Sequence, residues 1–113
     1  MALKDLQLDA RELREVLYLE RPSGTPSPSS GQSRRRWTRY ATVRGRVEPL
    51  TGREFWQAQE VNSQTTHRVK IRYVPGVTSK DRVIFGAREL NITSAVNVEE
   101  RGRIIILMCA EAT

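Results

Sequence analysis

Few residues of this chain have side chains that commonly perform catalysis or bind a metal. The chain has 113 residues with one histidine, His67, and one cysteine, Cys109. A lone histidine supports no Ser-His-Asp set, and a metal site needs several clustered Cys, His, Asp or Glu residues. Neither a P-loop nor a dinucleotide-binding glycine motif occurs. Glu99 and Glu100 are more typical of a turn than of an acid–base pair. We therefore expect no enzymatic activity, no metal and no cofactor.

The histidine and the cysteine each have a simple structural interpretation. We expect His67 to be a partly buried strand residue whose ring bonds a backbone group. Cys109 cannot form an internal disulfide, and we expect it to pack as a small hydrophobic residue in a reducing compartment. The longest apolar run, residues 104–110, is shorter than the ~18–20 residues that span a bilayer. Residues 1–5 lack the apolar core of a signal peptide. We expect no contact with a membrane.

Arginine dominates the charge of the chain. The net charge is +6, and 16 of the 19 cationic residues are arginine. Between residues 21 and 47 there are seven arginines and no acid. Because guanidinium forms paired hydrogen bonds with phosphate and carboxylate, this segment fits either a nucleic-acid backbone or an acidic protein surface. The triplet Arg34, Arg35 and Arg36 is either the solvated base of a loop or a contact with DNA or an acidic subunit.

Period-2 alternation predicts a mainly β protein. Apolar and polar side chains alternate along several short segments, which is typical of strands with one buried face. Six strands are expected, at residues 13–21, 37–50, 65–74, 80–85, 88–98 and 103–110. A flat sheet of this size would leave its edges exposed, so we expect closure into a small antiparallel six-stranded β-barrel or a tight sandwich.

Several strands carry more specific expectations. In the third strand, Val69 and Ile71 fall on a face that can be buried, while Lys70 falls on a cationic face that must meet water or an acidic partner. Gly45, inside the second strand, indicates a bend, a bulge or a close backbone approach. In the fifth strand, one face is expected to hold Leu90, Ile92, Ser94 and Val96. The sixth strand is apolar on both faces, so we expect it to sit centrally or to be covered by another subunit.

The connections divide into tight turns and longer excursions. Gly86 and Ala87 are typical of a type II′ hairpin turn. Pro22 is expected to end the first strand, and the Ser/Pro-rich residues 22–35 are expected to form a mobile loop. Residues 1–12 are expected to form an N-terminal arm and residues 13–113 a single barrel domain. Residues 50–64 are expected to form a long excursion between the second and third strands, with a short helix from Gly52 to about Gln59.

The excursion holds an aromatic pair, Phe55 and Trp56, that does not follow the alternation of a core strand. Two interpretations stay open. The pair caps one end of the barrel, or it anchors a contact with another molecule, as aromatic side chains often do.

Within and around this excursion the residues resemble a known family. The segments PLTGREF at residues 49–55, AQ at 58–59 and THRVKIRY at 66–73 are similar to the central signature of tailed-bacteriophage head–tail joining proteins. These are also called head closure, head completion or stopper proteins. The resemblance covers residues 13–111, although the loop at 22–33 is longer than usual. The signature residues are Gly52, Arg53, Glu54, Thr66, His67, Arg72 and Tyr73.

The resemblance implies a structural virion protein. Such proteins are small β-barrels that form a ring below the portal and its adaptor, continue or close the DNA channel, retain the packaged genome and present a docking surface to the tail. The implied partners are further copies in a six- or twelve-fold ring, the portal or adaptor ring, a tail terminator or tail tube protein, and double-stranded DNA. The implied location is the virion neck, after assembly in the host bacterial cytoplasm.

Two sets of site residues follow as hypotheses. Subunit or channel-gate contacts are expected at Arg53, Glu54, Phe55, Trp56 and Gln59. Contacts with DNA or with acidic patches of the adaptor are expected at Arg34, Arg35, Arg36 and Arg39.

A monomeric nucleic-acid-binding barrel is the alternative function. Small barrels with basic strands bind single strands by stacking bases on exposed aromatic rings. In this chain only Trp37 and Tyr40 lie among the arginines. Salt-sensitive oligonucleotide binding by a monomer would favour this alternative.

Overall fold

The computed structural model describes residues 11, 13–23, 36–100 and 102–112 of the chain. The expected N-terminal arm and most of the Ser/Pro loop lie outside these residues. The described residues form six strands and one α-helix, with a short 3-10 turn, η4 (Val98–Glu100), before the last strand. The elements are β1 (Glu15–Ser23), β2 (Arg36–Pro49), α1 (Gly52–Val61), β3 (His67–Arg72), β4 (Arg82–Phe85), β5 (Arg88–Asn97) and β6 (Ile104–Glu111).

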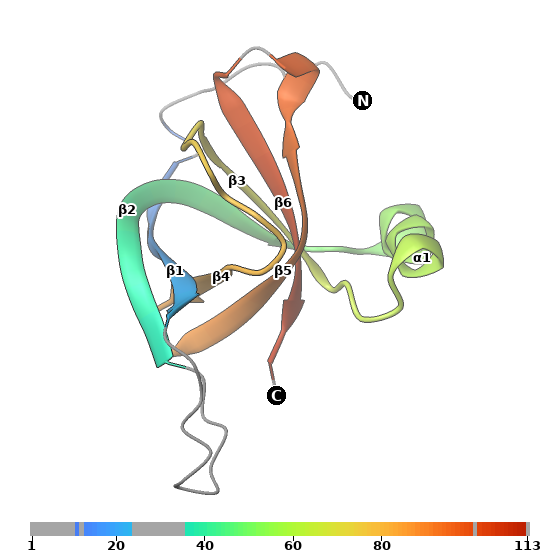
Figure 1. The fold of residues 1–113 in the computed structure, drawn as a ribbon. Coiled ribbons are helices and arrows are strands. Elements are labelled where there is room, and N and C mark those ends of the chain that lie inside the picture. The colour runs from blue at the N-terminus through green and yellow to red at the C-terminus, as the bar shows by residue number, and fades with distance from the viewer. Residues whose placement is uncertain (1–10, 12, 24–35, 101, 113) are drawn as a thin grey trace, which may run out of the picture.

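The strands close into a barrel in the order β1-β2-β3-β6-β5-β4. All neighbouring pairs are antiparallel, and β4 closes the ring by pairing with β1. Figure 1 shows the strands surrounding a single interior, with α1 standing apart from them. The predicted fold class, a six-stranded antiparallel barrel, is confirmed.

The core fills the inside of the barrel with alternate residues of its strands. Its fully buried members come from β1, β3, β4, β5 and β6 and include Leu17, Leu19, Val69, Ile71, Val83, Leu90, Leu107 and Cys109. β6 lies between β3 and β5, as its two apolar faces indicate. Its outward side chains, Ile104 and Ile106, form a second small cluster with Val98.

Two local expectations about the strands are wrong. The β5–β6 register shifts between Ile92 and Ser94. Beyond this bulge Ser94 pairs with Met108 and Val96 with Ile106, so both lie on the outer face instead of beneath Leu90 and Ile92.

Lys70 lies on the outer face of β3 and is buried, so of the two expected environments, water and an acidic partner, water does not apply. Pro22 is the second correction. Pro22 does not end β1, since it pairs with Trp37 and the strand continues to Ser23. β4 pairs with β1 only from Tyr18 to Glu20, so the missing N–H of Pro22 costs no bond on that side.

The turn expectations hold. Phe85 pairs with Arg88 across a two-residue turn, and Gly86 has a φ of +61° while Ala87 stays outside the left-handed region. A type II′ turn requires this conformation.

Gly45 allows a close approach between β1, β2 and β3. A Cβ at this position would lie 2.7 Å from Ile71 Cγ2, 2.8 Å from Leu17 Cδ1 and 2.8 Å from the Lys70 carbonyl oxygen. The predicted close backbone approach is confirmed. The barrel can keep this spacing only while position 45 has no side chain.

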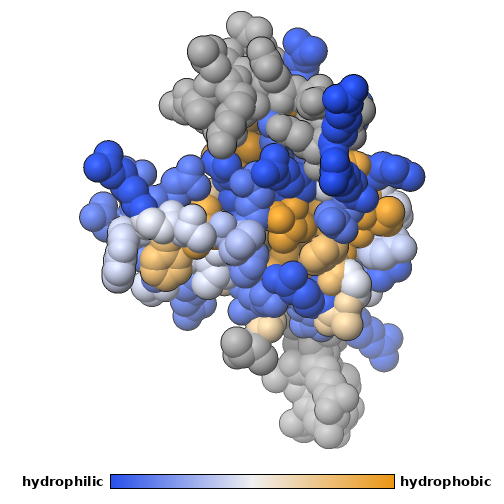
Figure 2. Space-filling model, turned by 180° about the vertical axis from the view of Figure 1, so that it is seen from behind, coloured by the Kyte–Doolittle hydropathy of each residue, from blue (hydrophilic) through white to orange (hydrophobic). Residues whose placement is uncertain are grey.

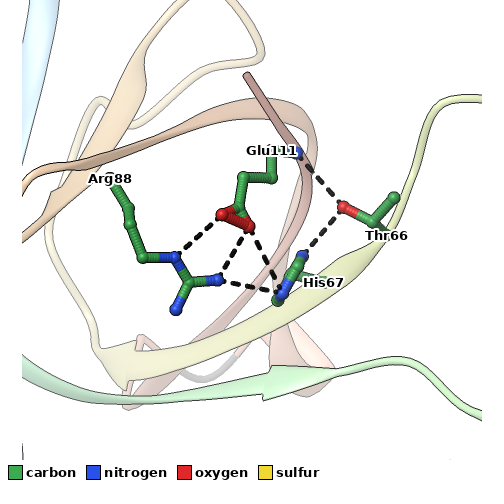
Figure 3. Close-up of polar contacts among 4 residues, drawn as sticks. All are labelled: Thr66, His67, Arg88 and Glu111. Carbon is green, nitrogen blue, oxygen red and sulfur yellow. Dashed lines mark hydrogen bonds and ion pairs between the residues drawn. The ribbon is translucent and has the colours of Figure 1, made fainter. Parts of the chain in front are cut away.

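At the base of α1, four residues tie β3, β5 and β6 together (Figure 3). Arg88 donates two hydrogen bonds of 2.8 Å to the Glu111 carboxylate and approaches His67 Nε2 at 3.2 Å. His67 Nδ1 lies 2.8 Å from Thr66 Oγ1, which also accepts a bond from the Glu111 N–H. The ring therefore bonds two side chains, and the expected backbone partner of His67 is wrong.

The hydrogen-bond partners define the state of His67. Arginine can only donate, so Nε2 must accept from Arg88 and the ring proton lies on Nδ1, facing Thr66. Burial lowers the pKa of His67, and the positive charge of Arg88 lowers it further, although Glu111 acts in the opposite direction. The hydrogen bonds from Arg88 lower the pKa of Glu111. The contacts of this cluster therefore favour a neutral His67 imidazole beside a charged Glu111 carboxylate.

We predict that Gly45→Ala destabilises the barrel. The added methyl group would force apart packed side chains and a backbone carbonyl, and overpacking of this kind costs about 1–3 kcal/mol. Urea unfolding measures the change. Thr42→Ala, at an exposed position of the same strand, is the matched control and should change stability by less than about 0.5 kcal/mol. Equal midpoints for the two variants would show that β1, β2 and β3 are not held at this spacing.

We predict that stability falls as the pH drops below the ordinary His67 pKa of 6.5. Because the pKa is lower in the folded protein, the unfolded chain binds more protons in this range, and the free energy of unfolding decreases with acidification. His67→Gln keeps an acceptor and a donor without titrating, so its stability should change less between pH 7 and pH 5. Urea midpoints measured across this range test the difference. Identical slopes in both proteins would contradict it.

Candidate functional site

Helix α1 projects from the barrel and buries none of its residues (Figure 1). Trp56 is 68% exposed and Val61 is 91% exposed. The Phe55 and Trp56 rings contact each other edge to face, with centroids 5.5 Å apart. A pair that capped the barrel would bury both rings, and the exposure of Trp56 excludes this interpretation.

Local sequence explains where the helix begins and ends. Glu54 lies in the first turn, where its charge complements the helix dipole, and the Asn62 N–H bonds the Ala58 carbonyl at the end. The predicted helix is confirmed and extends two residues beyond Gln59. The side chain of Gln59 donates to the Thr65 carbonyl. The helix is therefore attached by polar contacts at its base and has no apolar face in the core.

A groove of about 330 Å³ separates α1 from the outer face of β5 and β6. Ala58 and Val61 line the helix side, and the bulged Thr93 with Ser94 and Met108 line the barrel side. Sequence reasoning missed this groove because it placed Ser94 on the inner face. The local signal was the polar pair Thr93 and Ser94, which follows the alternating Leu90 and Ile92.

The hypothesised arginines separate into two groups. Arg34 and Arg35 lie outside the described residues, and Arg36 begins β2 with an exposed side chain. Arg39 lies further along β2, and its guanidinium approaches Glu20 at 3.3 Å and stacks on the Tyr18 ring at 3.8 Å. Arg39 therefore already has an acidic partner and an aromatic partner within its own chain.

The partner of Arg39 belongs to a wider network on the outside of β1 and β4. Glu20 is buried, and it also accepts from Arg82 at 2.8 Å. Arg82 lies 4.1 Å from the centre of the Trp37 ring, and Arg21 lies 4.4 Å from that of Tyr40. Arg21, Arg39 and Arg82, at this end of the barrel, thus each have an acidic partner and cover an aromatic face.

A second buried acid, Asp81, anchors the segment before β4. It accepts a 2.7 Å hydrogen bond from the Tyr40 hydroxyl. It also forms an ion pair with Arg21, whose Nε lies 3.4 Å from the carboxylate. Burial, followed by the bond to Asp81, raises the pKa of Tyr40. The phenol therefore stays protonated and acts here as a structural hydrogen-bond donor.

The signature residues occupy three separate places. Gly52, Arg53 and Glu54 begin α1. Thr66 and His67 belong to the cluster at the base of the helix, whereas Arg72 ends β3 at the other end of the barrel, beside Tyr73. The structure does not bring these residues into one site.

Burial raises the pKa of the Cys109 thiol to about 12, so it is not a thiolate nucleophile at neutral pH. Within residues 11, 13–23, 36–100 and 102–112, no group of three or more His, Cys, Asp or Glu residues could hold a metal. In the same residues, no helix has the length and apolar character needed to cross a membrane.

Figure 2 shows the face of the molecule opposite to the one seen in Figure 1. This face is mainly hydrophilic at its rim, and hydrophobic residues gather near its centre. The large hydrophobic residues exposed in the described chain are Val16, Trp56, Val61, Tyr73 and Val96. They are spread over β1, β5, α1 and the end of β3, which indicates more than one contact surface.

Comparison with known proteins gives a family and a fold. The family described as phage head completion protein matches residues 8–112. No curated protein matches the chain. Among solved structures, the solution structure of protein SF1141 from Shigella flexneri 2a is similar, with a TM-score of 0.67 and 21% identity over 94% of this chain and 98% of that chain. At this identity the likeness shows the fold alone.

The family match confirms the resemblance carried by residues 49–73. Membership implies a structural bacteriophage protein near the head–tail interface of the virion, in contact with other head or tail proteins. The closed barrel, the projecting helix and the match over residues 8–112 agree, and the chain belongs to the phage head completion protein family.

Proposed function

We propose that this chain is a subunit of the head–tail connector. Copies form a ring below the portal or adaptor that continues or closes the DNA channel, retains the packaged genome and provides the docking surface for the tail. The proposed neighbours are further copies in a six- or twelve-fold ring, the portal or adaptor above, and a tail terminator or tail tube protein below. Double-stranded DNA occupies the channel, and assembly takes place in the host cytoplasm before the ring resides in the neck.

The observation that carries this proposal is the unsupported helix α1. An isolated helix shorter than about 12–15 residues is marginal in water. α1 has 10 residues and buries none of them. Its Trp56 side chain contacts the Phe55 ring but remains 68% exposed. A neighbouring molecule that packs against the helix would supply the missing burial.

A ring provides such a neighbour. Each protomer of a cyclic ring needs two different lateral surfaces, one that projects and one that receives. α1 is the projecting surface, and its attachment between β2 and β3 holds it at a fixed place on the barrel. Residues 13–113 then act as one barrel domain, with residues 50–64 reaching toward a neighbour or the channel axis.

The alternative, a monomeric nucleic-acid-binding barrel, has less support. Base stacking needs accessible aromatic faces. Trp37 and Tyr40, the two aromatics among the arginines, each have a guanidinium stacked on one face. Trp56 is exposed, but its helix carries one arginine against two glutamates.

We predict that Phe55→Ala combined with Trp56→Ala blocks assembly of tailed particles while the monomer stays folded. Removing interface aromatics costs about 2 kcal/mol or more of contact free energy, and these side chains contribute nothing to the barrel core. Complementation of a phage that lacks the chain, scored as infectious particles, measures assembly, and urea unfolding measures folding. Gln57→Ala, on the same helix, is the control. A normal titre of infectious particles for the double variant would show that these α1 side chains make no contact needed for assembly.

We predict that replacing Arg34, Arg35 and Arg36 with serine lowers genome retention. Loss of three positive charges weakens binding to phosphate or to an acidic adaptor surface. The readout is the fraction of DNA-filled tailed particles. Lys80→Ser, which removes an exposed positive charge before β4, is the control. Normal numbers of filled particles for the triple variant would refute a role for this triplet.

A further inference from the structure

At one end of the β2–β3 ladder, the outer face contains two arginines with no acid between them. Gly45 and Ile71 form the last pair of this ladder, and Arg44 and Arg72 are the next residue of each strand beyond it. The row continues on β1 with Val16, which pairs with Arg44 and is 45% exposed. We call Val16, Arg44 and Arg72 the arginine row.

This row differs from four other outward arginines of the barrel, Arg39, Arg46, Arg68 and Arg82, which have acidic partners. Glu20 forms ion pairs with Arg39 and Arg82. Glu48 lies 3.2 Å from Arg46 and 3.6 Å from Arg68. Within the part of the chain that the structure describes, the side chains of Arg44 and Arg72 are exposed and have no ion pair. Like charges on neighbouring strands destabilise a sheet. The row therefore has a positive charge that an external acid would neutralise.

A hollow beside the row increases its capacity to receive another chain. Its volume is about 430 Å³, and Arg11, Arg14 and Arg46 contribute to its lining together with Glu15 and Val47. Arg46 follows Arg44 by two positions on the same face of β2, so the hollow adjoins the row. The surface thus combines positive charge, an exposed valine and a depression.

The last turn of α1 has the complementary properties. Glu60 and Val61 are both exposed, and the last turn contains no basic residue. The free carbonyl groups of a helix C-terminus add partial negative charge. We call Glu60 and Val61 the helix tip. Within the described residues Glu60 has no ion pair.

The helix tip cannot reach the arginine row of its own protomer. α1 joins β2 and β3 at the end where Pro49 pairs with His67, and Arg72 lies at the opposite end of β3. β3 has 6 residues, which corresponds to about 20 Å. A contact between these two surfaces must therefore join two copies of the chain.

We propose that the helix tip of one copy docks on the arginine row of the next. Glu60 meets Arg44 and Arg72, and Val61 packs beside Val16. This inference rests on the proposed ring and assigns the two lateral surfaces that such a ring requires. The contact is heterologous, so it propagates around an axis and closes when the rotation between copies permits. The exposed valines on both sides favour a protein partner over a nucleic-acid backbone, because protein interfaces combine arginine with apolar contact.

A charge exchange tests the contact in assembling phage. Arg72→Glu and Glu60→Arg should each lower the yield of tailed particles at least about tenfold, since juxtaposed like charges oppose association. The double variant restores opposite charges and should recover most of the loss. Both single variants should unfold at the same urea concentration as the unmodified chain. If the double variant folds but does not recover the yield, the contact is overturned. A DNA-binding role of Arg72 predicts the same failure to recover.

A cross-link gives an independent test. Purified necks carrying Glu60→Cys with Arg72→Cys should form a ladder of disulfide-linked oligomers under mild oxidation. Glu60→Cys with Lys80→Cys is the control and should give no ladder. The native Cys109 is buried, so it does not compete. A ring present in the neck without the ladder would overturn the helix-tip contact and leave the connector function intact. Absence of the chain from the neck would instead refute the connector function itself.

Discussion

Closure of the barrel is the constraint on which the rest of the structure depends. When β4 pairs with β1, every strand has a neighbour on both sides and the interior is filled by side chains from the strands themselves. No apolar surface remains inside for α1, whose residues all stay outside the core. The hydrogen bonds of Thr66 and Gln59 hold the base of the helix to the barrel. Closure thus produces a rigid body with one projecting element.

The same closure arranges the positive charge on the outside. β2 carries arginines along its length, and they differ in what lies beside them. Glu20, on β1, neutralises Arg39, and Glu48 lies beside Arg46. Among the described residues Arg44 has no ion pair. We propose that a neighbouring copy neutralises it.

Alternation along the strands predicted six strands closed into a barrel or a tight sandwich, with the last strand central or covered by another subunit. The glycine at position 45 indicated a bend, a bulge or a close approach. The structure shows the barrel, the central β6 and the close approach. These features depend on local patterns, because side-chain direction in a strand follows from sequence position alone. The bulge at Thr93, the burial of Lys70 and the pairing of Arg39 with Glu20 could not be predicted in this way. Each depends on which strand lies beside which, and on contacts between residues far apart in the chain. His67 shows the same limit, since its ring bonds Thr66 locally but depends on Arg88 for its second partner.

Amide hydrogen exchange in α1 tests most directly whether the helix depends on a neighbour. In the isolated chain, residues 52–61 should exchange fast while the amides of β3 and β6 remain protected by the barrel. In assembled necks, the same helix should become protected. Protection of α1 in the isolated chain equal to that of β3 would contradict this, because it would show that the barrel alone stabilises the helix.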